Sequence, residues 1–229
     1  MQEQTIPART KVPNQNGWFL PREHGATAML FTPIVCAALL ARQWRFSELA
    51  TVAAAFAGLA AKDPLVVLAR QRFVWKNRRP ETTAAAKWFA GWTVILFLSG
   101  VVLLLTWPLK AIVAMGLGVA VFSALAVAVN VKNRQRSTMF QIASAAALTS
   151  SSLATSLSAT GAIGPKCWWL WLLLAMQATA GILVVHARLD TRIALRGTTP
   201  ASHQFRRAAM VALVVLLSGA VIAASLRRG

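Results

Sequence analysis

Acidic side chains are scarce in this sequence: six Asp and Glu occur among 229 residues, against 24 Lys and Arg. Charged residues make up 13% of the chain, about half of the roughly 25% that is usual for a soluble domain. Hydrophobic residues make up 57%, and apolar runs of about 20 residues recur, enough to cross a hydrocarbon core about 30 Å thick. The composition excludes an ordinary soluble domain and predicts a polytopic membrane protein.

The motifs of several common site classes are missing as well. The two cysteines, Cys36 and Cys167, lie in or beside separate apolar runs without metal-ligand spacing. The sequence has no phosphate-cradling glycine loop, no zinc spacing and no arrangement typical of a Ser-His-Asp hydrolase. The first 22 residues are polar, and no small-residue cleavage site follows the first apolar run, so we expect no cleavable signal peptide.

Proline, glycine and charge clusters divide the apolar runs into about seven transmembrane helices. The expected fold is therefore all-α, a membrane helix bundle. Residues 1–21 are expected to form a cytoplasmic N-terminal tail, and residues 22–229 a single transmembrane domain. The predicted helices cover residues 25–41, 47–70, 85–106, 110–130, 139–160, 168–188 and 207–226.

The net charge of +18 and the pI near 12.0 would suggest a nucleic-acid partner in a soluble protein. In a membrane protein the positive-inside rule explains them, because 17 of the 24 Lys and Arg fall in the N-terminal tail and at the inner ends of the even-numbered helices. We therefore expect no nucleic-acid partner, and a multi-pass protein of the inner membrane with a cytoplasmic N-terminus. An odd number of helices would then place the C-terminus outside.

The stretch "TSSSLATSLSAT", residues 149–160, is unusually polar for a spanning helix. Its hydroxyls can bond to backbone carbonyls, and small side chains let helices approach closely, which favours a tight helix–helix seam. The alternative is a polar strip along an internal cavity.

The stretch "KDPLVVLARQRFVWKNRRP", residues 62–80, carries charge into an apolar helix. Charged groups at membrane depth cost about 2.5–3.5 kcal/mol each, so they usually face a bundle interior and find partners. Lys62 and Arg70 lie on one helical face with Asp63 beside Lys62. Pro64 removes a backbone donor and predicts a kink or break.

The sixth predicted helix ends in a second polar cluster on the same side of the membrane. His186 and Asp190 are one turn apart, as are Arg188 and Arg192. The first pair suits a proton carrier, although a histidine at a helix contact is the more common role.

The triplet Arg22-Glu23-His24 opens the first helix at the inner interface, where an acidic residue in the first turn is favoured by the helix dipole. This triplet belongs to "PREHGATAML", which with the later Pro33 resembles the "RPREHGAW…P" signature of the YwiC-like family of small bacterial membrane proteins. Thr27 stands where that signature has tryptophan.

A more distant resemblance is to the UbiA superfamily of prenyltransferases, which carries an NDxxDxxxD motif at the inner end of helix 2 and a basic stretch ending in Arg-Pro. Aligned at Arg79-Pro80, that motif falls on "KDPLVVLAR". Asp63 keeps the first aspartate, whereas Lys62 and Arg70 stand at other motif positions.

The superfamily's second motif, DxxxD, falls on "HARLD", where His186 replaces the first aspartate and Asp190 keeps the second. Superfamily enzymes typically have nine helices and hold diphosphate through magnesium bridged by these aspartates. Magnesium needs near-octahedral oxygen ligation, and two surviving carboxylates cannot build the usual pair of sites. The resemblance therefore implies a shortened UbiA-like bundle without a metal or other cofactor, Mg²⁺ being disfavoured.

These residues lead to the hypothesis of a metal-independent, cytoplasm-facing pocket for an isoprenoid diphosphate or anionic lipid. An active enzyme would be a UbiA-like transferase or lyase with Asp63, Asp190 and His186 as catalytic groups. The phosphate-binding residues are expected to be Lys62, Arg70, Arg78, Arg79, Arg188 and Arg192. Two alternatives stay open: the arginines serve only topology, contacting lipid headgroups, or the chain is a non-catalytic accessory protein of a larger complex with an unknown partner.

Overall fold

The computed structural model describes residues 24–75, 81–131, 137–194 and 201–227, which form helices and their short connections. Each of the seven predicted spans is helical in this part of the chain, so the all-α expectation is confirmed. The elements are α1 (His24–Ala41), α2 (Phe46–Arg70), the π-helix η1 (Gln71–Trp75), α3 (Glu81–Thr106), α4 (Leu109–Val131), α5 (Thr138–Thr149), α6 (Ser151–Thr160), α7 (Pro165–Ala194) and α8 (Ala201–Arg227).

The bundle has two ends, which we name after the arginines at either end of α2. The Arg45 end holds the connections from α1 to α2, from α3 to α4 and from α6 to α7. The Arg70 end holds η1 and the beginnings of α3, α5 and α8. The positive-inside prediction places the Arg70 end in the cytoplasm.

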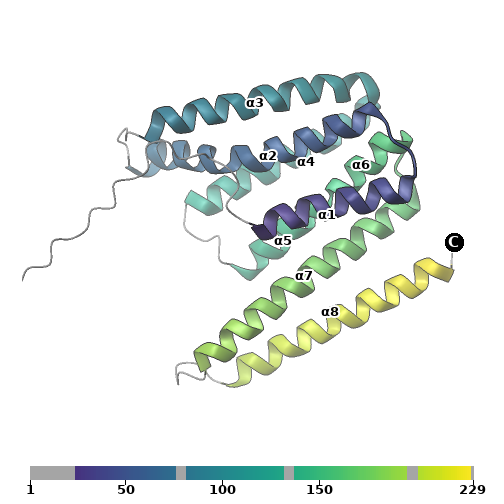
Figure 1. Ribbon diagram of the computed structural model, residues 1–229. Coiled ribbons are helices and arrows are strands. Elements are labelled where there is room, and N and C mark those ends of the chain that lie inside the picture. The colour runs from purple at the N-terminus through teal and green to yellow at the C-terminus, as the bar shows by residue number, and fades with distance from the viewer. Residues whose placement is uncertain (1–23, 76–80, 132–136, 195–200, 228–229) are drawn as a thin grey trace, which may run out of the picture.

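Helices α1, α5 and α6 form the centre of the bundle (Figure 1). α1 packs along α6 and α5, while α6 also contacts α2 and α5 packs along α7. α3 packs mainly on α2, and α8 mainly on α7, so these two helices lie at opposite edges. The centre therefore separates the α2 side of the molecule from the α7 side.

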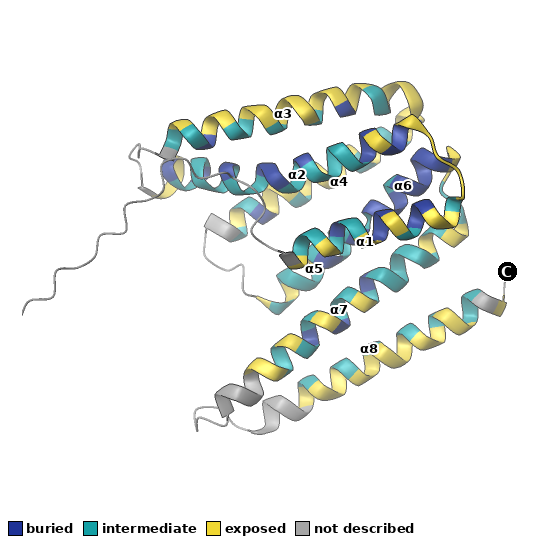
Figure 2. Cartoon of the chain, in the orientation of Figure 1, coloured by how far each residue is buried: buried dark blue, intermediate teal, exposed yellow. Residues whose placement is uncertain are grey.

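Among the described residues, five helices are long and apolar enough to cross a membrane. The edge helices α3 and α8 expose most of their surface, whereas α6 is almost entirely buried (Figure 2). The exposed residues on α3, α4 and α8 include large apolar side chains such as Phe97, Leu117 and Leu216. Apolar outer faces on helices of this length are those of an integral, multi-pass membrane protein. The five candidate spans are Phe46–Val74, Thr82–Thr106, Leu109–Val129, Pro165–Leu189 and Arg206–Ser225.

Small residues set the close packing of α2. Its buried positions include Ala57, Ala60 and Ala61, which let neighbouring backbones approach in the way typical of membrane helices. Pro64 is also fully buried, and α2 continues through it, so the break that the sequence predicts at this proline does not occur. The backbone changes to a π-helix seven residues later, at Gln71.

The predicted helix at 139–160 is divided into α5 and α6 at Ser150. Hydroxyls on both sides of the division donate to nearby carbonyls: Ser150 to Ala147 at 2.6 Å and Ser152 to Thr149 at 2.9 Å. Such bonds compete with the helical ladder and explain a division in a segment without proline or glycine.

Candidate functional site

The sequence-predicted residues of the first cluster lie at and near the Arg70 end of α2. Lys62, Asp63 and Arg70 are half-buried, and each has an interaction partner. Arg72, in η1, is exposed. Arg78 and Arg79 lie outside the described residues, so their part in the site stays a prediction.

The second cluster lies on α7. His186 Nε2 is 2.9 Å from Oε1 of Gln141 on α5, so the partner that the structure gives this histidine is an amide on a neighbouring helix. Arg188 is exposed. Asp190 and Arg192 fall within α7, but their side chains lie outside the described part, and the expected pairing of His186 with Asp190 stays untested.

The N-terminal interface motif is mostly beyond what the structure describes. Arg22 and Glu23 precede the first described residue, and His24 begins α1 with its side chain undescribed. The predicted role of this triplet therefore stays a prediction, as does that of the tail before it.

The structure places the two clusters on different sides of the molecule. α1, α5 and α6 lie between α2, which carries Asp63, and α7, which carries His186 (Figure 1). A joint pocket would have to pass through or around these central helices.

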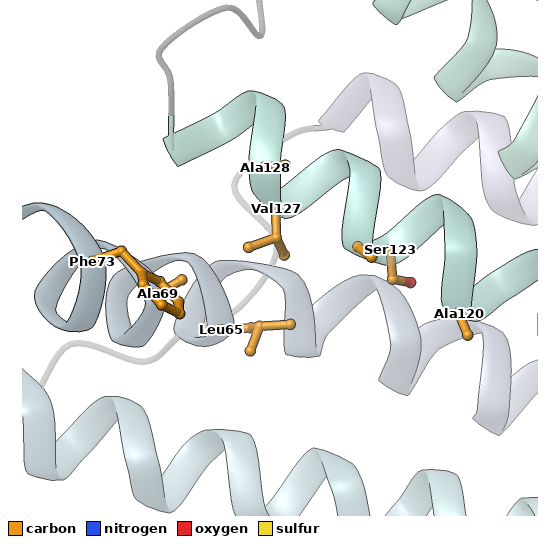
Figure 3. Close-up of a pocket in the computed structure, with 8 residues that line it drawn as sticks. Leu65, Ala69, Phe73, Ala120, Ser123, Val127 and Ala128 are labelled. Carbon is orange, nitrogen blue, oxygen red and sulfur yellow. The ribbon is translucent and has the colours of Figure 1, made fainter.

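An open groove of about 610 Å³ runs between α2 and α4 toward the Arg70 end (Figure 3). Its α2 side consists of Leu65, Ala69 and, in η1, Phe73. Arg70 follows Ala69 in the chain, and Arg72 precedes Phe73. Neither arginine lines the groove, but both lie at the helix end toward which it runs, and apolar walls with a basic helix end suit an amphiphile. The α4 side is lined by Ala120, Ser123, Ala124, Val127 and Ala128.

The α4 wall of this groove has a second property. Ala120, Ala124 and Ala128 repeat at intervals of four, and Gly116 extends the same spacing by one more turn. All four are exposed. A stripe of small residues at this spacing is typical of surfaces on which another membrane helix packs closely.

The Arg45 end holds a buried polar network that sequence reasoning missed. Ser158 of α6 is its centre: its carbonyl accepts a hydrogen bond from Ser47 Oγ at 3.0 Å. The Ser158 Oγ is 2.5 Å from Thr51 Oγ1 and accepts from the indole Nε1 of Trp107 at 2.9 Å. The network therefore joins α6 to the first turns of α2 and to the α3–α4 connection.

The direction of each bond in this network follows from hydrogen counting, because a hydroxyl has one hydrogen to donate. Thr51 Oγ1 donates its hydrogen to the Ser47 carbonyl at 3.0 Å. The hydrogen between Thr51 and Ser158 must then come from Ser158. The Ser47 hydroxyl gives its own to the Ser158 carbonyl. Each of the three hydroxyls has therefore donated its one hydrogen, and its oxygen can act only as an acceptor for any further partner.

Glu48 lies in the same turn of α2 and is 3% exposed. Its Oε1 accepts from the Arg45 backbone amide at 3.0 Å, and the Glu48 amide donates to the Arg45 carbonyl at 3.0 Å, which caps the helix. Its Oε2 is buried without a hydrogen-bond partner. In the described part of the chain, no Lys or Arg forms an ion pair with this carboxylate. A buried oxygen of this kind needs an explanation, such as an ion or water.

The remaining hydroxyls of α6 act as a helix–helix seam. Ser151 Oγ donates to the Leu30 carbonyl of α1 at 2.9 Å. This bond joins α6 directly to α1, three residues before the buried Pro33. Within α6, Thr155 Oγ1 donates to the Ser151 carbonyl at 3.0 Å, so this hydroxyl is satisfied inside its own helix. These contacts support the seam interpretation of residues 149–160.

One sequence signal pointed to the Arg45 end. Glu48 is the single acidic residue near the membrane face that is predicted to lie outside. Thr51 follows it three residues later, a spacing that places both on the same face of a helix. The burial of Glu48 could not be read from the sequence, because α2 has exposed apolar residues in the same turn. Among the described residues, no three His, Cys, Asp or Glu side chains gather into a metal site.

Comparison with known proteins yields a match at the level of a family. The model of the YwiC-like protein family matches residues 20–156, more than half of the chain, from the residues just before α1 into α6. No curated protein and no solved structure matches. The match includes α1, the α2–α4 groove and most of the Ser-rich helix α6. The chain therefore belongs to the YwiC-like family.

Proposed function

We propose that this YwiC-like membrane protein binds an amphiphile with a phosphorylated head group, its apolar chain lying in the α2–α4 groove. The observation that carries the proposal is the groove itself, whose walls are apolar and which runs toward the helix end that carries Arg70 and Arg72. The head group would lie at the Arg70 end, which the charge distribution predicts to be cytoplasmic. Both an isoprenoid diphosphate and an anionic lipid have this chemistry.

The head group is expected to supply most of the affinity. An apolar chain leaving lipid for an apolar groove gains little, because lipid tails are as apolar as the groove walls. Arginine, in contrast, holds phosphate through paired, charge-assisted hydrogen bonds. The groove would then select chain shape, with the narrow alanine wall of α4 favouring a slender chain.

Native mass spectrometry of the detergent-purified protein tests this proposal with farnesyl diphosphate, geranylgeranyl diphosphate, phosphatidylglycerol and free diphosphate as separate ligands. Saturable binding of one amphiphile, without binding of free diphosphate, shows whether the ligand is an isoprenoid diphosphate or an anionic lipid. The Arg70→Ala, Arg72→Ala double variant is expected to lose it. EDTA should leave binding unchanged, because the site is proposed to work without a metal.

Two controls locate the site. Ala124→Trp fills the groove and should abolish binding, whereas Ala114→Trp places the same side chain at an exposed position of α4 outside the groove. Arg188→Ala should leave groove binding intact. Loss of binding in Arg188→Ala would instead support a joint pocket that includes α7, and no saturable binding of any amphiphile would overturn the proposal.

The predicted chemistry is a separate step. Ionisation of a bound allylic diphosphate breaks the bond between carbon and oxygen, and the diphosphate leaves with the electron pair, stabilised by arginine. The allylic cation that remains would lose a proton, and Asp63, on the helix that lines the groove, is the proposed acceptor. Asp190 and His186, on α7, would take this role only in the joint pocket that Arg188→Ala tests. Release of diphosphate from bound farnesyl diphosphate is the readout, and saturable binding without release assigns a binding protein.

A second candidate function rests on the small-residue stripe from Gly116 to Ala128. In this alternative the protein is a non-catalytic accessory subunit, and a helix of the larger complex packs along the stripe. Native mass spectrometry from membrane nanodiscs should then show an added protein mass that Ala124→Trp removes and Ala114→Trp retains. A monomer without added mass counts against it.

A further inference from the structure

We propose that the buried carboxylate of Glu48 holds a small monovalent cation, Na⁺, at the Arg45 end of the bundle. This site lies at the opposite end of α2 from the groove, so it does not depend on the proposed function. Two observations carry it: a buried carboxylate oxygen without a hydrogen-bond partner, and hydroxyls in the same part of α2 whose hydrogens are already used.

The first observation is the state of the carboxylate. Glu48 is 3% exposed, and its Oε2 has no hydrogen-bond partner, while Oε1 is used by the Arg45 amide. A carboxylate oxygen buried in this way is unfavourable unless something positive or hydrogen-donating meets it. Ionisable residues inside membrane helices are usually retained for a partner of this kind.

The second observation excludes the neighbouring hydroxyls as that partner. Ser47, Thr51 and Ser158 have each committed their one hydrogen within the network, so none is left for Glu48. Their oxygens keep free lone pairs. Hydroxyls that have lone pairs but no spare hydrogen are complementary to a cation that prefers oxygen ligands.

Two helix ends meet near Glu48. Glu48 lies in the first turn of α2, whose N-terminus carries roughly half a positive charge. Arg45 and Ser47, beside it in the chain, lie against the end of α6, whose C-terminus carries roughly half a negative charge. Because these partial charges oppose each other, they do not replace a cation as the partner of the carboxylate.

Charge balance selects the class of cation. One carboxylate neutralises one positive charge, whereas Ca²⁺ and Mg²⁺ favour more anionic oxygen ligands. Arg45 is the competing cation, but its guanidinium is exposed and lies beside Gly161 rather than in an ion pair with Glu48. A monovalent ion therefore fits the site better than either alternative.

The test is the unfolding midpoint of the full-length protein in detergent, with choline chloride replaced stepwise by NaCl at constant ionic strength. The wild-type midpoint should rise saturably by a few degrees, since a ligand that binds only the folded state stabilises it. Glu48→Gln should remove the rise. Asp63→Asn, a matched change at the other end of the same helix, should retain it.

Other outcomes overturn the proposal. No difference between Na⁺ and choline in the wild type would mean that Oε2 is met by water. An equal rise in the wild type and in Glu48→Gln would locate the effect elsewhere. If Glu48→Gln cannot be purified, Glu48→Asp keeps the charge with a shorter reach and should show a saturable rise at higher Na⁺ concentration. An unchanged Na⁺ response in Glu48→Asp would contradict a direct ligand role.

Discussion

The indole Nε1 of Trp107 donates a hydrogen bond to the Ser158 hydroxyl at 2.9 Å, joining the α3–α4 connection to the end of α6. Trp107 is 9% exposed and Ser158 is 2% exposed, so water does not compete freely for this bond. The same hydroxyl meets Thr51, and the same residue's carbonyl meets Ser47. A single serine thus joins the end of α6 to α2 by two hydrogen bonds and to the α3–α4 connection by a third.

Ser158→Ala is expected to destabilise the protein by about 2 kcal/mol, because it leaves the buried Trp107 donor without a partner. Reversible unfolding in mixed detergent measures the change. Ser218→Ala is the control: its hydroxyl bonds only to the Val214 carbonyl of its own helix, so its loss should change stability little. Equal effects of the two substitutions would contradict the central role of Ser158.

Gly161→Ala is expected to cost about 1–2 kcal/mol. Gly161 ends α6 with φ +78°, a left-handed conformation in which a Cβ atom is strained. The added Cβ would meet Arg45 Nη1 at 3.8 Å, an ordinary contact, so the cost would come from the backbone. Gly118→Ala, at an exposed position inside α4 with open space and no positive φ, should not destabilise the protein in the same unfolding assay.

The contact between His186 and Gln141 should appear as a coupling energy of about 1 kcal/mol between α5 and α7. Unfolding of His186→Ala, Gln141→Ala and the double variant gives this value by a double-mutant cycle. A coupling near zero would free His186 from this structural role and strengthen its predicted role as a proton carrier.

The membrane orientation can be measured with single cysteines in a background where Cys36 and Cys167 are replaced by alanine. Gln43→Cys lies at the Arg45 end and Ser137→Cys at the Arg70 end, and both positions are exposed. A membrane-impermeant maleimide should label Gln43→Cys in spheroplasts, and Ser137→Cys only after permeabilisation. The reverse pattern would overturn the positive-inside assignment.

Sequence alone predicted the helices well, because runs of apolar residues and their breaks are set by the membrane. The division at Ser150 was not predicted, since it depends on hydroxyls that bond back to carbonyls rather than on proline or glycine. Of the kink or break expected at Pro64, the break does not occur. Buried between neighbouring helices, that proline is accommodated within a continuous helix.

The site was less accessible to sequence reasoning. Charge clusters identified Asp63 and His186 as residues near one membrane face, but which helices lie side by side depends on packing among α1, α5 and α6. Glu48 was overlooked because a single acid near a helix start is usually an exposed cap. Its burial arises from α6, whose small serines and alanines allow close approach.

Because the chain is synthesised from its N-terminus, the pairing of α8 with α7 bears on the order in which the helices assemble in the membrane. The bonds of Ser158 to Trp107, Thr51 and Ser47 involve no residue beyond α6, so the Arg45 end can close before the last two helices are made. α8 then follows as the partner of α7, whose polar attachments to α5 are already in place at Gln141. Biogenesis would proceed as a nucleus of the first six helices followed by a terminal hairpin.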